Sequence, residues 1–366
     1  MDHPAIFPDA SRTREPSLSL AANQRRSWLH INGMSFENRN AEQKSYREEP
    51  VRFPHGETEL AGVLCLPSGA GPHPVIVYIH DSGPAGRDGY HGFPPLWQAF
   101  ARRGCASLSW DKPGVGESTG DWMGQTPQDR VRECLAALTF LAQRPDIAAS
   151  RIGVYGRSQA GWVIPHLMEM TDLVTCIVAV SISVASGSEQ DLYRIAHQLP
   201  ADGYSPDEVE KALAFTRVRA DLARYRAPYE RIADLQKLVE QESWFEAADG
   251  AYPAQAYAGE SSATERYPRP VFSALACPIL LIFGEHDTLI DVGESVETYR
   301  TEMQKIGNAD VTIKIFPGAD HGPFLSQTGG MREMRQALRQ PEKSFPPGYL
   351  ELMGDWLQQH LAPARG

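Results

Sequence analysis

The segment that most restricts how this chain can fold is residues 151–162, where a predicted strand runs directly into a predicted helix. Residues 152–155 are a short apolar run typical of a buried strand, and residues 159–170 have the amphipathic spacing of a helix. The turn between them, G-R-S-Q, places a serine hydroxyl at the end of the sheet. Free N–H groups at the start of the helix favour a negative oxygen beside it. We therefore predict Ser158 as a nucleophile, with a helix-capping serine as the alternative.

This turn departs at one position from the G-x-S-x-G pattern of a nucleophile elbow. Gly156 occupies the first glycine position, but Ala160 stands at the second, and Gly161 follows one place later. Small residues are needed here because the strand and helix backbones approach closely. Alanine is the smallest replacement for glycine, so we interpret Ala160 as a tolerable variant.

The composition is that of a soluble globular protein, large enough for two domains or for one α/β domain with an insertion. The 366 residues carry a net charge of −11 with no basic cluster, which argues against nucleic acid and anionic membranes as partners. No apolar run approaches the roughly 20 residues of a membrane helix. The first ten residues lack the pattern of a signal peptide. The five cysteines form no C-x-x-C pair, so we expect buried free thiols and a cytoplasmic location.

Apolar runs alternate with helical patterns along most of the chain, which predicts an α/β fold with a mostly parallel, doubly wound sheet. A hairpin at residues 51–67 is expected before the first parallel strand. The predicted strands are 74–79, 106–110, 152–155, 176–183, 278–283 and 311–316, of which 74–79, 152–155 and 176–183 are expected to be buried. The predicted helices of the core are 96–103, 127–143, 159–170, 292–306 and 349–361.

The pattern changes between the fourth and fifth of these parallel strands. Residues 190–268 are charge-rich and contain no buried-strand run, and S-P-D-E at 205–208 is a capping box. We predict a helical cap at 190–268, inserted into a core of residues 48–189 and 269–366, and a polar N-terminal arm of residues 1–47. Aromatic residues of the cap are interpreted mainly as packing residues, some of which could line a pocket: Trp244, Phe245, Tyr252 and Tyr257.

Three polar residues follow strands of the predicted sheet, in the chain order Ser158, Asp287, His321. The carboxyl ends of parallel strands share one edge, so these side chains can meet. A serine hydroxyl needs a neutral imidazole to take its proton, and a carboxylate orients that imidazole. We predict a catalytic triad, while a loop histidine or a capping aspartate would explain the same residues structurally. Nearby alternatives for these roles are Glu285, His286 and Asp291, of which we interpret His286 as a neighbour of the acid.

The loop H-D-S-G-P at residues 80–84 follows the first parallel strand, at the sheet edge where ligand sites form. Its backbone N–H groups could complete an oxyanion hole together with the N–H of Gln159. We choose Ser82 as the donor in this loop, with Asp81 as second choice, and expect His80 to brace the loop. The alternative is a turn without chemical function.

Two other site types are disfavoured. The segment D-K-P-G-V-G-E-S at 111–118 lacks the order of a phosphate-binding loop, so we interpret it as structural. His286, Asp287 and His321 could suggest a metal, but no H-E-x-x-H or Cys/His ligand spacing supports one. We therefore expect no metal and no cofactor.

The chain resembles the α/β-hydrolases, in the serine carboxylesterase and acylaminoacyl-peptidase-like branch. The resemblance covers residues 50–361 without the cap and rests on five motifs: H-D-S-G-P at 80–84, D-K-P-G-V-G-E-S at 111–118, G-R-S-Q-A-G at 156–161, G-E-H-D at 284–287 and G-A-D-H-G at 318–322. It implies the α/β-hydrolase fold and the triad, and leaves the substrate open.

The sequence thus predicts a serine hydrolase that cleaves a carboxylic ester, as a small-molecule acyl substrate, through an acyl-enzyme. Amide or thioester hydrolysis, or acyl transfer, would use the same triad. A non-catalytic binding protein on the same fold is the alternative from another class. These motifs do not indicate the acyl chain length of the substrate or the oligomeric state of the protein.

Overall fold

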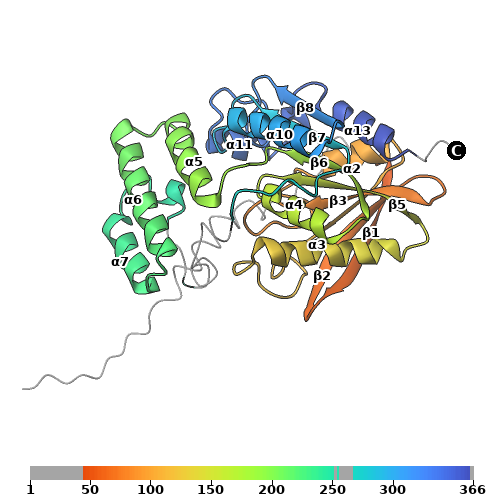
Figure 1. Cartoon of the computed structure of the whole chain (residues 1–366), viewed down its shortest axis with the longest axis horizontal. Helices are drawn as coiled ribbons and strands as arrows, with labels where there is room; N and C mark the ends of the chain where they lie inside the picture. Colours follow the sequence, from red (N-terminus) through yellow and green to blue (C-terminus); the bar gives the residue numbers. More distant parts are fainter. Residues whose placement is uncertain (1–43, 251–253, 255–266, 363–366) are drawn as a thin grey trace, which may run out of the picture. The chain divides into compact units, whose positions relative to one another are not determined.

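The computed structural model describes residues 44–250, 254 and 267–362, and in this part of the chain eight strands form one sheet (Figure 1). The strand order is β1-β2-β4-β3-β5-β6-β7-β8. β2 pairs antiparallel with β1 and β4, and all other neighbours are parallel, as the sequence predicts. The strands are β1 (Tyr46–His55), β2 (Thr58–Pro67), β3 (His73–Ile79), β4 (Ala106–Trp110), β5 (Ile147–Arg157), β6 (Val174–Val180), β7 (Ile279–Gly284) and β8 (Val311–Phe316).

Helices cover both faces of the sheet, so its central strands are buried on both sides (Figure 1). Side chains of α3, α4 and α10 join one apolar cluster, and side chains of α2 and α13 join the cluster on the opposite face. This explains the continuous apolar runs of the parallel strands. The core helices are α2 (Pro94–Ala101), α3 (Pro127–Ala142), α4 (Ala160–Met170), α10 (Val292–Ile306) and α13 (Tyr349–His360).

The described residues between β6 and β7 form α5 (Gly187–Ala201), α6 (Pro206–Arg224), α7 (Tyr229–Val239) and the 3-10 helix η1 (Glu246–Ala248). The predicted capping box at Ser205 is confirmed, because its hydroxyl accepts from the N–H of Glu208 and its own N–H donates to the Glu208 carboxylate. Trp244 and Phe245 are buried in a small core of these helices, as expected for packing residues. Residues 1–43 of the predicted arm, and Tyr252 and Tyr257 of the predicted cap, lie outside the described residues.

The sequence analysis missed two short helices after β8, α11 (Met331–Ala337) and α12 (Pro341–Ser344). No residue of α11 is buried, so the helix leaves no apolar periodicity to detect. Polar contacts hold its start, since Asp202 of the insertion accepts from the N–H of Arg332 at 3.1 Å. The Glu333 carboxylate also accepts from the N–H of Gln327 at 2.7 Å.

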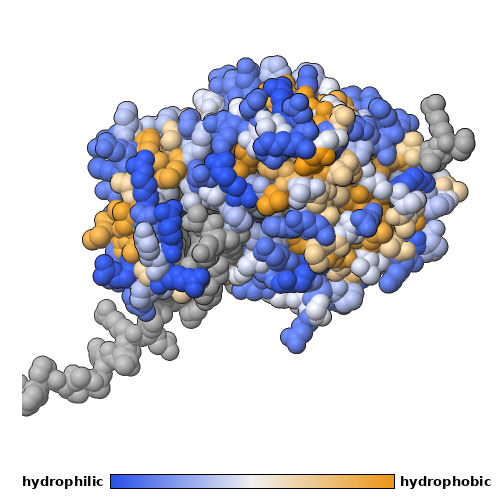
Figure 2. Space-filling view, in the orientation of Figure 1, coloured by the Kyte–Doolittle hydropathy of each residue, from blue (hydrophilic) through white to orange (hydrophobic). Residues whose placement is uncertain are grey.

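Apolar side chains are visible on the viewed face of both the α/β core and the helical insertion (Figure 2). In the insertion the most exposed are Leu238 and Tyr225, at 80% and 79%. None of the described helices combines the length and the apolar character needed to cross a lipid bilayer.

Gly284 ends β7 where the backbone of the loop after β8 passes closely. A Cβ atom on this residue would lie 2.3 Å from the carbonyl oxygen of Asp320 and 2.4 Å from that of Ala319. We expect Gly284→Ala to lower the free energy of unfolding by about 1–3 kcal/mol, because backbone cannot yield as a side chain can. Urea unfolding measures this. Gly124→Ala, with no atom within 4 Å of the new Cβ, is the control and should stay within about 0.5 kcal/mol of wild type. Equal stability of the two variants would contradict the expectation.

Candidate active site

Ser158 lies in a strained turn between β5 and α4. Its φ is 54°, in the left-handed region that residues other than glycine rarely adopt. The turn is held by two backbone hydrogen bonds: the N–H of Ser158 donates to the carbonyl of Val180 at 3.0 Å, and the N–H of Gly161 donates to the carbonyl of Ser158 at 3.0 Å. The serine hydroxyl therefore sits at a fixed point beyond the end of β5, as the strand-turn-helix pattern predicts.

The structure explains why alanine is accepted in this turn. Ala160 is fully buried, and a Cβ added to Gly156 would lie 2.6 Å from the Cβ of Ala160. Only one of the two positions can therefore carry a methyl group. Glycine is required at 156, and alanine is tolerated at 160 because 156 is glycine.

Ser158, His321 and Asp287 meet at the carboxyl ends of β5, β8 and β7. The Nε2 atom of His321 lies 2.9 Å from the Oγ of Ser158, and its Nδ1 lies 2.8 Å from the Oδ2 of Asp287. A carboxylate can only accept, so Nδ1 carries the proton and Nε2 is free to accept from the serine hydroxyl. The three residues that the sequence analysis grouped thus form one continuous hydrogen-bonded chain.

Backbone groups hold Asp287 in place. Its other oxygen, Oδ1, accepts from the N–H groups of Leu289 at 2.9 Å and Ile290 at 3.2 Å, and its side chain is fully buried. A buried carboxylate is stable only when its oxygens are paired in this way. The alternative residues have other partners: Glu285 accepts from the N–H of Gly318, His286 contacts the carbonyl of Ser326, and Asp291 caps α10.

The loop after β3 leaves the sheet beside the serine turn, because Ile79 pairs with Gly156. Among the described residues, the backbone N–H groups of Ser82 and Gln159 donate to no protein acceptor, and the same holds for Asp81. This is the arrangement on which the predicted oxyanion hole depends.

His80 is buried between aromatic rings and acts as a brace. Its ring centroid lies 5.5 Å from that of Phe93 and 5.6 Å from that of Trp110. Burial, with the positive charges of Lys112 and Arg130, lowers the pKa of His80 to about 3. The ring is neutral at ordinary pH and has no basicity for proton transfer there.

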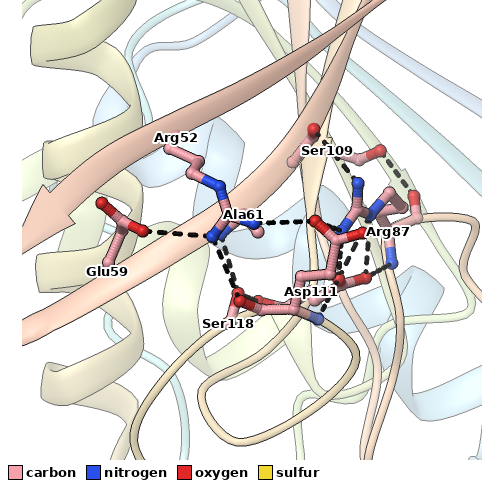
Figure 3. Close-up of polar contacts among 9 residues, drawn as sticks. Arg52, Glu59, Ala61, Arg87, Ser109, Asp111 and Ser118 are labelled. Carbon is pink, nitrogen blue, oxygen red and sulfur yellow. Dashed lines mark hydrogen bonds and ion pairs between the residues drawn. The ribbon is translucent and has the colours of Figure 1, made fainter.

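The loop at residues 111–118 is filled by its own aspartate (Figure 3). Asp111 accepts from the N–H of Glu117 at 3.0 Å, and both the N–H and the guanidinium of Arg87 donate to it. A Cβ on Gly116 would lie 2.3 Å from the same carboxylate, which explains the glycine. Ser118 ties the loop to β2 by accepting from the N–H of Ala61 at 2.9 Å. The Asp111 carboxylate occupies the space that a bound anion would need.

Buried cations near the serine were missed by the sequence analysis. Arg130 of α3 donates to the side-chain oxygen of Gln159 and to the carbonyl of His80. Lys112 donates to the carbonyls of Asp81 and Gly83. In the sequence, Arg130 lies in a predicted helix and Lys112 shortly follows a predicted strand. Most basic side chains at such positions are solvated, so the pattern does not predict that these two are buried.

Aromatic side chains lie beside the serine turn. The hydroxyl of Tyr267, in the segment after the insertion, accepts from the side-chain amide of Gln159 at 2.9 Å. Its ring packs on Trp162 of α4 with centroids 5.1 Å apart. Burial and the charges of Asp291 and Asp287 raise the pKa of Tyr193 on α5. Trp162 and Tyr267 thus form an aromatic flank beside the serine turn.

Asp320, directly before His321, is a further buried carboxyl. Its Oδ1 accepts from the N–H of Gly322 at 2.7 Å and of Phe324 at 2.8 Å, which holds the histidine loop. Its Oδ2 is buried without a partner among the described residues. Burial raises the pKa of Asp320 to about 6, although these N–H groups and His321 oppose the shift.

Comparison with known proteins gives a consistent result. The family model described as "Alpha/beta hydrolase family" matches residues 75–333. Esterase EstD of Thermotoga maritima is 23% identical over 269 residues, which are 72% of this chain and 57% of that esterase, so little more than half of its length is matched. An uncharacterised 31.7 kDa protein of Escherichia coli is 21% identical over 63% of this chain and 78% of its own length.

Solved structures show the same fold. An esterase of Pyrococcus furiosus superposes with a TM-score of 0.53 at 16% identity, covering 90% of this chain and 96% of that one. The α/β-hydrolase GrgF of a Penicillium species superposes with a TM-score of 0.52 at 14% identity, covering 87% of this chain and all of that one. At such identities the likeness concerns the fold alone.

We expect Asp320→Asn to become more stable relative to wild type as pH rises. The folded protein binds the Asp320 proton more tightly than the unfolded chain, so wild type loses stability between pH 4 and 6 as the buried carboxyl ionises. Asparagine retains an oxygen for both N–H groups and carries no charge. The gain should reach about 3 kcal/mol at most between pH 4 and 7.5, measured by urea unfolding of both proteins. A pH-independent difference would contradict the shifted pKa.

Proposed function

Because the chain belongs to the α/β-hydrolase family, we propose that it is a serine hydrolase that cleaves a carboxylic ester through an acyl-enzyme. The observation that carries this proposal is the hydrogen-bonded chain from the Ser158 hydroxyl through His321 to Asp287. These distances suit proton transfer from the serine without rearrangement. The name of the sequence relative Esterase EstD supports an ester as substrate.

In the first half of the reaction, the Oγ of Ser158 attacks the ester carbonyl while the Nε2 of His321 takes the hydroxyl proton. Asp287 holds the imidazole in the tautomer that can accept this proton, and stabilises the imidazolium that forms. The histidine then gives the proton to the leaving alcohol, and the acyl group remains on the serine. In the second half, water adds to the acyl-enzyme by the same route, and the acid leaves.

The negative oxygen of each tetrahedral intermediate is stabilised by the backbone N–H groups of Ser82 and Gln159. Both N–H groups lack protein acceptors among the described residues. Arg130, which donates to the side chain of Gln159, adds positive charge beside them, within a buried region where charges act strongly. Burial and the charge of Arg130 lower the pKa of Lys112 well below its usual range, so its main role here is as a hydrogen-bond donor. Stabilisation of charge that develops during the reaction is the largest catalytic contribution of such sites.

The aromatic flank formed by Trp162 and Tyr267 favours an apolar group on the substrate. This is the part of the proposal that concerns specificity.

All five cysteines carry free thiols, which favours a reducing compartment such as the cytoplasm.

We expect a fluorophosphonate probe to form one adduct on Ser158, because the activated hydroxyl attacks phosphorus as it would a carbonyl. Intact-protein and peptide mass spectrometry measure the adduct. Ser158→Ala should carry none. Ser118→Ala, which removes a buried loop hydroxyl, is the control and should still be labelled on Ser158.

Screening p-nitrophenyl esters, anilides and acyl thioesters in parallel then identifies the bond that is cleaved. If the protein prefers anilides or thioesters, the proposed substrate class changes to amides or thioesters, and the role of the triad stays the same. A folded wild-type protein that forms no adduct and cleaves none of these substrates would contradict the proposal and favour a binding protein.

We expect Asp287→Asn to lower kcat by about 10³- to 10⁴-fold with little change in KM. Asparagine would donate to Nδ1 and impose the tautomer in which Nε2 carries the proton and cannot accept one. Steady-state kinetics on the best ester measures this. Asp291→Asn, at the start of α10, is the control and should remain active. Similar rates for the two variants would argue against Asp287 as the orienting acid.

A further inference from the structure

Arg157, the residue directly before Ser158, connects three loops of the site. Its Nη2 lies 2.6 Å and its Nε 3.1 Å from the Oδ2 of Asp81, in the loop after β3. Its Nη1 donates to the carbonyl of Gly322 at 3.2 Å, in the loop that carries His321. The residue is buried, with 6% of its surface exposed. One guanidinium thus links the serine turn to both neighbouring loops.

Lys112 holds the backbone of the same β3 loop from the other side. Its Nζ donates to the carbonyls of Asp81 and Gly83. The carbonyl of Asp81 and the N–H of Ser82 belong to one peptide group, and in a trans peptide these two bonds point in opposite directions. Fixing this carbonyl toward Lys112 therefore aims the N–H of Ser82 away from the lysine.

The carboxylate of Asp81 pairs with Arg157, while Lys112 holds its backbone carbonyl. Burial would raise the pKa of its carboxyl, but the charges of Arg157 and Lys112 outweigh that effect and hold the pKa below its usual range. The carboxylate is therefore ionised at neutral pH, and the contact is an ion pair there. Breaking a buried pair leaves an unpaired charge, so both loops are held firmly.

We propose that Arg157, Asp81 and Lys112 are positioning residues that place the Ser82 N–H and the His321 loop relative to the Ser158 hydroxyl. They act through the residues that they hold, without touching the substrate. This deepens the proposed function and rests on it. It also accounts for an aspartate following His80, since the carboxylate is the partner of the arginine.

An arginine is needed at 157 because its planar fork reaches Asp81 and Gly322 together. Lysine keeps the charge but donates from a single atom. We therefore choose Arg157→Lys as the test. The matched control is Arg144→Lys, because Arg144 makes a similar two-fold contact with Asp146, at 2.9 and 2.8 Å, beside the opposite end of β5.

The first readout separates positioning of the oxyanion donor from general loss of structure. Sulfur accepts hydrogen bonds weakly, so a thiono ester, with C=S in place of C=O, gains less from the oxyanion hole. For Arg157→Lys we expect kcat on the ester to fall about 10- to 100-fold with little change in KM. The ratio of kcat on the ester to kcat on the thiono ester should fall as well. Arg144→Lys should stay within about twofold of wild type in both.

The second readout does not require activity. Hydrogen exchange of peptides that contain residues 80–84 and 319–323 should be faster in Arg157→Lys than in Arg144→Lys, because both loops lose a contact. Exchange equal in the two variants, or an unchanged ratio of the two kcat values, would overturn the positioning role. A wild-type protein that reacts with neither probe nor ester would instead refute the proposed function, and the exchange experiment would still decide whether Arg157 holds the loops.

Discussion

The site depends on one geometric constraint: the carboxyl ends of β3, β5, β7 and β8 emerge at the same edge of a parallel sheet. Residues far apart in the chain meet there without long connections. Close approach of these loops requires two glycines, since a Cβ on Gly156 would contact Ala160 and a Cβ on Gly284 would contact the loop that carries His321. The sheet therefore brings the loops together, and the glycines let them come within hydrogen-bond distance.

Charge is distributed unevenly around this edge. Arg130, Lys112 and Arg157 are buried near the serine turn and the β3 loop. Burial lowers the pKa of Lys112 well below its usual range, and His80 is neutral because its pKa is low. Asp81 balances part of this positive charge. Burial of charge is unfavourable unless it is paired, so such a cluster is expected where a negative charge forms during a reaction. The buried positive charge near the serine turn is thus consistent with the negative oxygen of the proposed intermediate.

Much of the fold and of the site follows from local sequence patterns. The strands at 106–110 and 311–316 and the helix at 292–306 occur at the predicted residues. The first strand is buried throughout and the helix along one stripe, while β8 at the sheet edge is only partly buried but keeps alternating apolar residues. The contact of Ser158, Asp287 and His321 follows from their positions after parallel strands. Helix α11 was missed because none of its residues is buried, so its sequence carries no apolar period. Asp320 was missed because its burial depends on neighbours that are distant in the chain.

By itself, the sequence determined the parallel sheet, the strand-turn-helix that carries Ser158 and the order of the three polar residues, since periodicity and turn chemistry are local properties. Only the tertiary structure decided which carboxylate faces His321 and which charges are buried. Arg157 and Asp81 are 76 residues apart, and their ion pair has no signature in either segment. Burial and pairing are relations between distant segments, and these exist only once the sheet has brought the segments together.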